Sequence, residues 1–229
     1  MKKIIIAALL AVCSMSAFAQ ERTLMPIDWQ KIEKMVTTMP DSVKSLTTRL
    51  TAPQLDKTLT MEERQLAVYG QSFLSEGSEQ SLADEAWDFY GKDQYADAVA
   101  SAKKALDINP FNTSALIAAA YAIDDLIESG NTTYQESECQ LYYNRSMRVF
   151  NTIATTGDGS PEHPFYVSSV AEEYSFMRYY LNLWKYSSQN LVGQCDVFTL
   201  GEGSESYSDK TISFEASRVL QLEMKMFGF

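Results

Sequence analysis

Residues 83–127, ADEAWDFYGKDQYADAVASAKKALDINPFNTSALIAAAYAIDDLI, set the architecture of the chain. Apolar residues recur at helical spacing in three segments of this stretch, 83–90, 96–106 and 113–127. Gly91-Lys92-Asp93 forms a turn after the first segment, and Asn109-Pro110 ends the second. The stretch therefore predicts three α-helices joined by short connections.

The order helix, tight turn, helix, proline and helix resembles a tetratricopeptide repeat, whose period is about 34 residues. Three small residues, two aromatic residues and a proline stand at the positions that define such a repeat. In that order they are Ala86, Ala98 and Ala105, then Phe89 and Tyr95, then Pro110. One full repeat, 79–112, and the first helix of a second match the pattern. We expect tetratricopeptide-like helical hairpins over 79–154, although the turn at 128–136 is long and polar.

Most of the remaining chain also has helical periodicity. Helices are expected over 26–38, 40–50, 60–73, 137–153, 166–183 and 216–226. Thr60 and Glu63 have the spacing of a capping box. Strand-like residues at 191–200 and 211–214 flank a turn at 201–208, which predicts a β-hairpin appendix over 190–216. The predicted fold class is mainly α with this small C-terminal β-hairpin, and residues 20–229 are expected to form a single helical domain.

Three stretches resemble a family of exported Bacteroidetes proteins, domain of unknown function 4919. They are DKTLTMEE at 56–63 with Tyr69-Gly70, the TGDG loop at 156–159 ahead of EEY at 172–174, and 191–196 followed by ISFE at 212–215. Two positions depart from the family pattern: Val68 stands where a tyrosine is usual, and Glu215 where an aspartate is frequent. The resemblance implies an exported protein and a shared fold, and it carries no established activity.

The N-terminus has the features of a signal peptide. Lys2 and Lys3 precede an uncharged run, and Ala17-Phe18-Ala19 places small residues where signal peptidase requires them. The apolar core at 4–12 is shorter than the roughly 20 residues of a membrane span. A lipoprotein signal ending at Cys13 is the alternative, but Val12 is large where a small residue is needed. We expect cleavage of residues 1–19, between Ala19 and Gln20, and a periplasmic or secreted protein without a membrane span.

Composition excludes several function classes. The chain has 30 Asp and Glu against 19 Lys and Arg, a net charge of −11, which disfavours binding to nucleic acids or anionic membranes. A single histidine excludes His-rich metal centres and most His-based catalytic relays. No phosphate-binding, dinucleotide-binding or calcium-binding loop pattern is present in the sequence. We therefore expect no cofactor, no metal site and no catalytic residue, as is typical of a non-enzymatic protein.

The repeat resemblance implies a binding surface. In tetratricopeptide folds the first helix of each pair lines a concave groove, and fixed positions of that helix point into it. Carried over to this chain, those positions are Trp87, Tyr90, Ile117, Tyr121 and Asp124. The three aromatic residues would form a stripe with an acidic edge at Asp124 and Asp125, as a groove for a protein or peptide partner needs. The alternative is that other parts of the chain cover this face.

A second hypothesis is a carbohydrate-active hydrolase or glycan-binding protein. It would use Asp158, in the loop at 156–161, together with Glu173 and nearby tyrosines. The competing interpretation is a structural turn in which the Asp158 carboxylate accepts hydrogen bonds from backbone amides.

Cys139 and Cys195 remain after removal of the signal peptide. An oxidising compartment permits a disulfide between them, which would stabilise the fold by about 4 kcal/mol. Two buried thiols are the alternative. The sequence as a whole predicts an exported, mainly α-helical module that binds a protein or peptide partner in the cell envelope.

Overall fold

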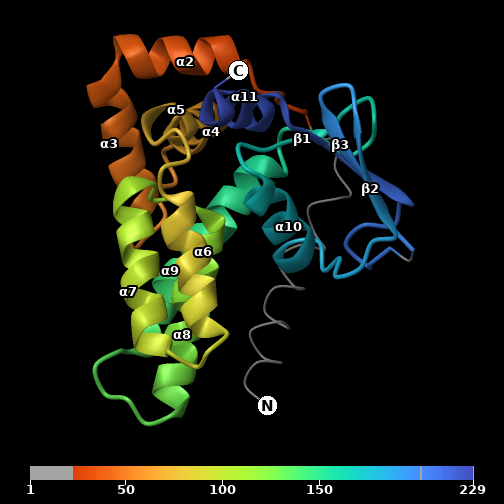
Figure 1. Ribbon diagram of the computed structural model, residues 1–229. Helices are drawn as coiled ribbons and strands as arrows, with labels where there is room; N and C mark the ends of the chain where they lie inside the picture. Colours follow the sequence, from red (N-terminus) through yellow and green to blue (C-terminus); the bar gives the residue numbers. More distant parts are fainter. Residues whose placement is uncertain (1–22, 202, 229) are drawn as a thin grey trace. The chain divides into compact units, whose positions relative to one another are not determined.

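The computed structural model describes residues 23–201 and 203–228, so the predicted signal peptide and its cleavage site lie outside the described residues. The described chain is mainly α-helical, with a small β-sheet (Figure 1). It divides into two compact units. A helical unit contains residues 27–152 and 222–228, and a sheet unit contains residues 23–26 and 153–221.

The helical unit contains α2 to α9, and side-chain caps begin α2, α4 and α8. The bounds of the helices are α2 Trp29–Thr38, α3 Pro40–Thr51, α4 Met61–Tyr69, α5 Gln71–Leu74, α6 Gln80–Tyr90, α7 Tyr95–Ile108, α8 Thr113–Glu128 and α9 Glu136–Ile153, which ends at the unit boundary. Asp28 caps α2 and Asn112 caps α8, each by accepting a backbone N–H three residues on. The predicted capping box of Thr60 and Glu63 is confirmed at the start of α4.

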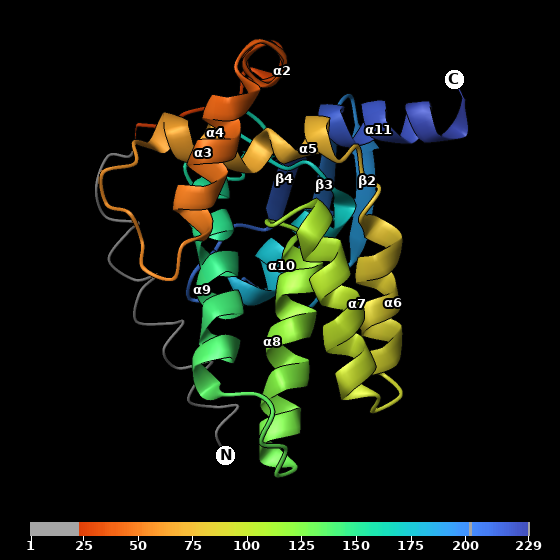
Figure 2. The same ribbon diagram turned by 90° about the vertical axis from the view of Figure 1, so that its left-hand side faces the viewer.

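Alanine residues form the contact among α6, α7 and α8, which lie side by side in both views (Figures 1 and 2). Ala86 on α6 and Ala98 and Ala105 on α7 are fully buried. On α8 every residue from Thr113 to Ala120 is buried as well. A methyl side chain lets neighbouring helices approach closely, because the interaxial distance is set by the residues at the contact.

The sheet unit contains a four-stranded sheet with the order β1-β4-β3-β2. Its elements are β1 Phe165–Tyr166, α10 Val170–Tyr179, β2 Ser188–Val192, β3 Cys195–Thr199, β4 Thr211–Glu215 and the start of α11 Ser217–Phe227. β1 pairs parallel with β4, and the other pairs are antiparallel. The Phe176 ring of α10 packs against the rings of Phe165 and Phe214. This aromatic core joins the helix to the sheet.

The structure differs from the predicted elements in this unit at two places. The stretch predicted as one strand, 191–200, is divided between β2 and β3 by a tight turn at Gly193, whose φ is +65°. The predicted pairing of this region with 211–214 is present as the antiparallel pair β3–β4. The predicted helix over 166–183 is shorter, because Tyr166 pairs with β4 and Asn182 has a φ of +55°.

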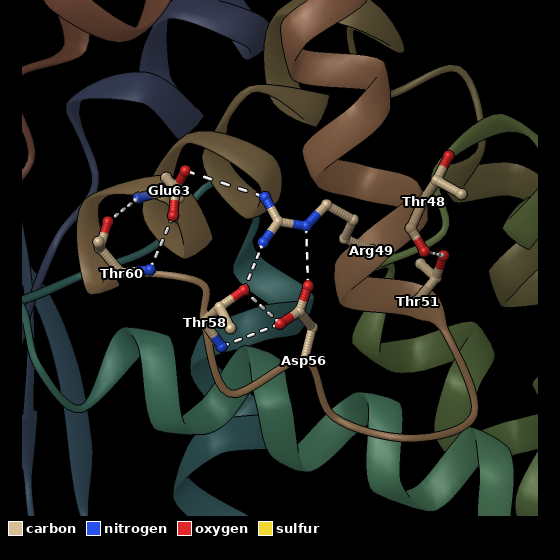
Figure 3. Close-up of polar contacts among 7 residues, drawn as sticks. All are labelled: Thr48, Arg49, Thr51, Asp56, Thr58, Thr60 and Glu63. Carbon is tan, nitrogen blue, oxygen red and sulfur yellow. Dashed lines mark hydrogen bonds and ion pairs between the residues drawn. The ribbon is translucent and has the colours of Figure 1, made fainter.

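An arginine network closes the connection between α3 and α4 (Figure 3). Arg49 donates from Nε to the Asp56 carboxylate at 2.8 Å and from Nη2 to the Thr58 hydroxyl at 2.8 Å. Asp56 also accepts the backbone N–H and the hydroxyl of Thr58, at 2.9 and 2.6 Å. These bonds lower the pKa of Asp56 to about 2, with the Thr58 hydroxyl as the largest cause. The network therefore fixes the turn that leads into the capping box of α4.

A second arginine holds the C-terminal end of α3. Arg148 on α9 donates from Nη1 to the carbonyl oxygens of Leu50 and Ala52, at 2.6 Å each, and from Nη2 to that of Pro53 at 3.0 Å. The last carbonyl groups of a helix have no partner within the helix and attract positive charge. Arg148 therefore fastens α3 to α9 through the backbone.

We expect Arg148→Ala to destabilise the protein by about 2 kcal/mol, because three carbonyl oxygens lose a charged donor. Arg148→Lys should recover only part of this loss, since an ammonium group lacks the planar fork that reaches several acceptors. Chemical denaturation followed by circular dichroism measures the difference. The exposed Lys104→Ala serves as a control, with an expected change below about 0.5 kcal/mol. An Arg148→Ala protein as stable as this control would contradict the assignment.

We expect the Asp56 carboxyl to titrate near pH 2 in the folded protein, well below its usual value of 3.8. The ionised group then stabilises the fold above its unfolded pKa, and the contribution is lost as pH falls through about 2. NMR titration of the side-chain carboxyl measures this value. Thr58→Ala should raise the pKa of Asp56 more than Arg49→Ala does, because the Thr58 hydroxyl makes the larger contribution. The reverse order would show that the arginine charge dominates.

Candidate functional site

Three aromatic rings that the sequence singled out lie together on α6 and α8. The Trp87 ring centroid lies 5.5 Å from that of Tyr90 and 6.2 Å from that of Tyr121. The Tyr90 and Tyr121 centroids are 6.2 Å apart, and Tyr95 at the start of α7 adds a fourth ring 5.5 Å from Tyr90. Each of these residues is only partly buried. We call the four residues the Trp87 cluster.

Hydrogen bonds fix the orientation of these rings. Trp87 donates from Nε1 to the Ser114 hydroxyl on α8 at 2.9 Å. The Tyr90 hydroxyl donates to the Asp125 carboxylate, also on α8, at 2.6 Å. Burial, and then this bond to a carboxylate, raises the pKa of Tyr90, so the phenol remains a donor at neutral pH. The cluster is thus held in a single arrangement by bonds that cross from α6 to α8.

The other two predicted groove residues, Ile117 and Asp124, are not part of the Trp87 cluster. Ile117 is 5% exposed and is therefore not part of the accessible surface. Asp124 is partly buried, and its charge contributes, after burial itself, to raising the pKa of Cys139 on α9 to about 11. The acid that holds the Trp87 cluster is its neighbour Asp125.

Ser114 was missed by the sequence analysis, although a signal for it exists. Ser114, Tyr121 and Asp125 are seven and four residues apart along α8, a spacing that places them on one face of a helix. A polar residue aligned in this way with an aromatic and an acidic residue is a candidate partner for the tryptophan across the helix pair.

The Asp158 loop is closed by its own hydrogen bonds. The Asp158 carboxylate accepts the backbone N–H of Ser160 at 2.9 Å, and the N–H groups of Asp158 and Gly159 donate to the carbonyl oxygen of His163 at 2.9 and 3.0 Å. Gly159 has a φ of +85°, and a Cβ there would lie 2.7 Å from the Tyr207 hydroxyl oxygen. The loop thus forms a turn in which Asp158 caps a backbone amide.

Of the two carboxylates predicted for a ligand site, only that of Asp158 is exposed to solvent. Asp158 is exposed, whereas Glu173 in the first turn of α10 is fully buried. Their use as one ligand site stays a prediction.

Cys139 and Cys195 are free thiols and partly buried in the structure, and a disulfide between them stays a prediction. Over residues 23–201 and 203–228, no three His, Cys, Asp or Glu side chains are grouped so that they could hold a metal ion. Within the same ranges no helix has both the length and the apolar character needed to cross a membrane.

Comparison with known proteins identifies the family. Searches of curated proteins and of solved structures returned no match. A family model described as a domain of unknown function, DUF4919, matches residues 30–225. The match includes the Arg49 network, the Trp87 cluster and the Asp158 loop, and it covers most of the chain. The chain therefore belongs to the DUF4919 family.

Proposed function

We propose that this chain is an exported, non-enzymatic binding protein of the cell envelope whose Trp87 cluster takes up a protein or peptide partner. The observation that carries the proposal is the cluster itself, in which partly exposed rings from three helices are fixed in contact with one another. Rigid aromatic anchors lose little conformational entropy on binding, and such residues dominate the binding energy of many interfaces. A surface of preformed rings therefore favours binding of a partner over catalysis.

The proposal includes a repeat-like arrangement of α6, α7 and α8. The buried positions of Ala86, Ala98 and Ala105 support tetratricopeptide-like hairpins, because small residues at those positions let paired helices touch. On this view α6 and α8 are the first helices of successive pairs, and the Trp87 cluster lies on the face that they share. Export by the predicted signal peptide, to the periplasm or beyond, and an origin in the Bacteroidetes belong to the same proposal.

The chemistry around the cluster favours a positively charged peptide segment. Asp93 is exposed and accepts a hydrogen bond from the Tyr95 hydroxyl at 2.8 Å, and Asp125 accepts one from the Tyr90 hydroxyl. Aromatic faces attract lysine and arginine side chains, and carboxylates add to this attraction. The net charge of the chain, −11, also steers cationic partners toward it.

The alternative, a glycan-binding protein or carbohydrate-active hydrolase at the Asp158 loop, has less support. The carboxylate of Asp158 already accepts a backbone amide, and Glu173 is buried away from solvent. We therefore place the partner-binding function at the Trp87 cluster.

Crosslinking in the native cell, followed by affinity capture and mass spectrometry, tests the proposal. We expect wild type to capture a partner that Trp87→Ala loses, because the central ring of the cluster is removed. Leu74→Ala is the control, since it removes an exposed apolar side chain from α5 in the same unit. Equal capture by wild type and by a folded Trp87→Ala variant, with folding checked by circular dichroism, would refute the proposed site.

Asp125→Asn tests the charge of the partner. An asparagine oxygen can still accept the Tyr90 hydroxyl, so the ring arrangement is retained while one negative charge is lost. We expect affinity for the contacting segment of the captured partner to fall about fivefold at low salt, and the salt dependence to become weaker. Titration calorimetry at two ionic strengths measures both quantities. Asp107→Asn, an exposed acid on α7, is the control, and an equal effect there would argue against a local contact.

A further inference from the structure

The sheet unit carries exposed aromatic side chains that the proposed function does not use. Trp184 is 58% exposed and Tyr186 is 43% exposed, both in the irregular segment between α10 and β2. A large ring left in water forgoes the hydrophobic stabilisation that burial would give. Two such rings, two residues apart in the chain, form a candidate contact surface.

Internal contacts hold both rings in place. The Trp184 ring packs edge-on against Tyr179 with centroids 5.6 Å apart, and its Nε1 donates to the Asn182 side chain at 2.8 Å. The Tyr186 ring packs against Tyr174 at 6.1 Å and against Phe198 at 5.1 Å. The two helix partners, Tyr174 and Tyr179, are five residues apart on α10, so they lie about 7.5 Å apart along its axis and about 140° apart around it. The rings of Trp184 and Tyr186, two residues apart in the chain, are therefore held against different sides of α10.

A row of hydrogen-bonding side chains, Tyr174, Gln189 and Asp196, begins at the pair formed by Tyr174 and Tyr186. The Tyr174 hydroxyl donates to Gln189 Oε1 at 2.6 Å and lies 3.5 Å from the Tyr186 hydroxyl. Gln189 donates from Nε2 to the Asp196 carboxylate at 3.0 Å. Gln189 and Asp196 lie on the same face of the β2–β3 pair as Phe198, since Gln189 pairs with Phe198 and Asp196 is two residues away. This face carries Phe198 on β3 and Phe214 on β4, and it becomes polar at Asp196 and Gln189.

The row retains further capacity for hydrogen bonds. Burial, and then the contact with Tyr186, raises the pKa of Tyr174 to about 12, so this phenol keeps its proton at neutral pH. The Gln189 amide has a second N–H, and a carboxylate such as that of Asp196 can accept several donors. Hydroxyl groups, which both donate and accept, are complementary to such a mixed row.

We propose that this surface binds a neutral oligosaccharide. Its residues are Tyr174, Tyr179, Trp184, Tyr186, Gln189 and Asp196, and we call it the Trp184 surface. The faces of aromatic rings carry negative potential and attract the slightly positive C–H groups on the face of a sugar ring. The planar amide and carboxylate beside them suit sugar hydroxyls.

The local charges favour a neutral ligand over a charged one. Arg178 and Lys185 are exposed here, and Asp196 is partly buried, so neither sign dominates. Arg178 lies over the Tyr174 ring at 5.5 Å. The mixed charges disfavour both a strongly cationic peptide and an anionic membrane surface. A sugar also uses the polar row, which a lipid surface would leave without partners.

Tryptophan fluorescence and calorimetry with the full mature chain test this inference. The probes are maltohexaose, cellohexaose, xylohexaose and laminarihexaose at up to millimolar concentration. Binding should protect Trp184, the tryptophan on this surface, from acrylamide quenching, and Trp184→Ala should abolish the protection. We expect Trp184→Ala and Gln189→Ala to weaken binding of the preferred sugar about tenfold or more. Because Trp184 is mostly exposed, its loss should leave thermal unfolding unchanged.

Two controls separate this site from the rest of the chain. Val192→Ala removes a side chain of similar exposure, 62%, from the opposite face of β2 and should bind the sugar as wild type does. Trp87→Ala should also bind normally, so a failure here and a failure of the peptide-binding proposal are distinguishable. Absence of binding to every sugar, or equal binding by wild type and Trp184→Ala, would overturn the inference. Binding to anionic vesicles that depends on Trp184, without sugar binding, would overturn it in favour of a membrane surface.

Discussion

Close contact among α6, α7 and α8 is the constraint on which the helical unit depends. Ala86, Ala98 and Ala119 contribute only methyl groups to this contact and are fully buried there. Large rings have no space in so narrow a contact, because protein interiors are packed at near-crystalline density. The rings of Trp87 and Tyr90 therefore lie at its margin, where the separation of the helices also allows bonds to Ser114 and Asp125. The same alanine packing that stabilises the helices thus positions the candidate binding surface.

Apolar side chains such as Val43, Leu50 and Tyr69 are also buried in the remainder of the helical unit, and two arginine residues add polar contacts to this packing. Arg148 binds the carbonyl groups at the end of α3, and Arg49 orders the turn that follows it. The motif that signalled family membership, residues 56–63, supplies the acceptors for Arg49 and the cap of α4. The geometry of a helix connection therefore accounts for this part of the family pattern.

Local features of the sequence were predicted better than distant ones. The capping box of Thr60 and Glu63 and the helices around Ala86 depend on spacings of a few residues, and both are present. The contact of Arg148 with Leu50 joins residues almost a hundred positions apart, and no local pattern announces it. The division of 191–200 into two strands was missed because Gly193 interrupts a run of strand-forming residues whose side chains alone suggest continuity. No local pattern indicates the exposure of Trp184 and Tyr186, since burial depends on tertiary packing.

The Trp87 cluster and the Trp184 surface differ in the hydrogen bonds that their polar atoms make. This difference is the reason that we propose different ligands for them. In the Trp87 cluster, Nε1 of Trp87 and the Tyr90 hydroxyl are bonded across the helices to Ser114 and Asp125, so a ligand meets ring faces and carboxylate charge. Beside Trp184, the side chains of Tyr174, Gln189 and Asp196 can still donate and accept hydrogen bonds. No charge of one sign dominates there. Ring faces beside negative charge favour binding of a cation, whereas ring faces beside hydrogen-bond donors and acceptors favour binding of a neutral polyol. The selectivity that we propose for each surface thus follows from the groups that orient its rings.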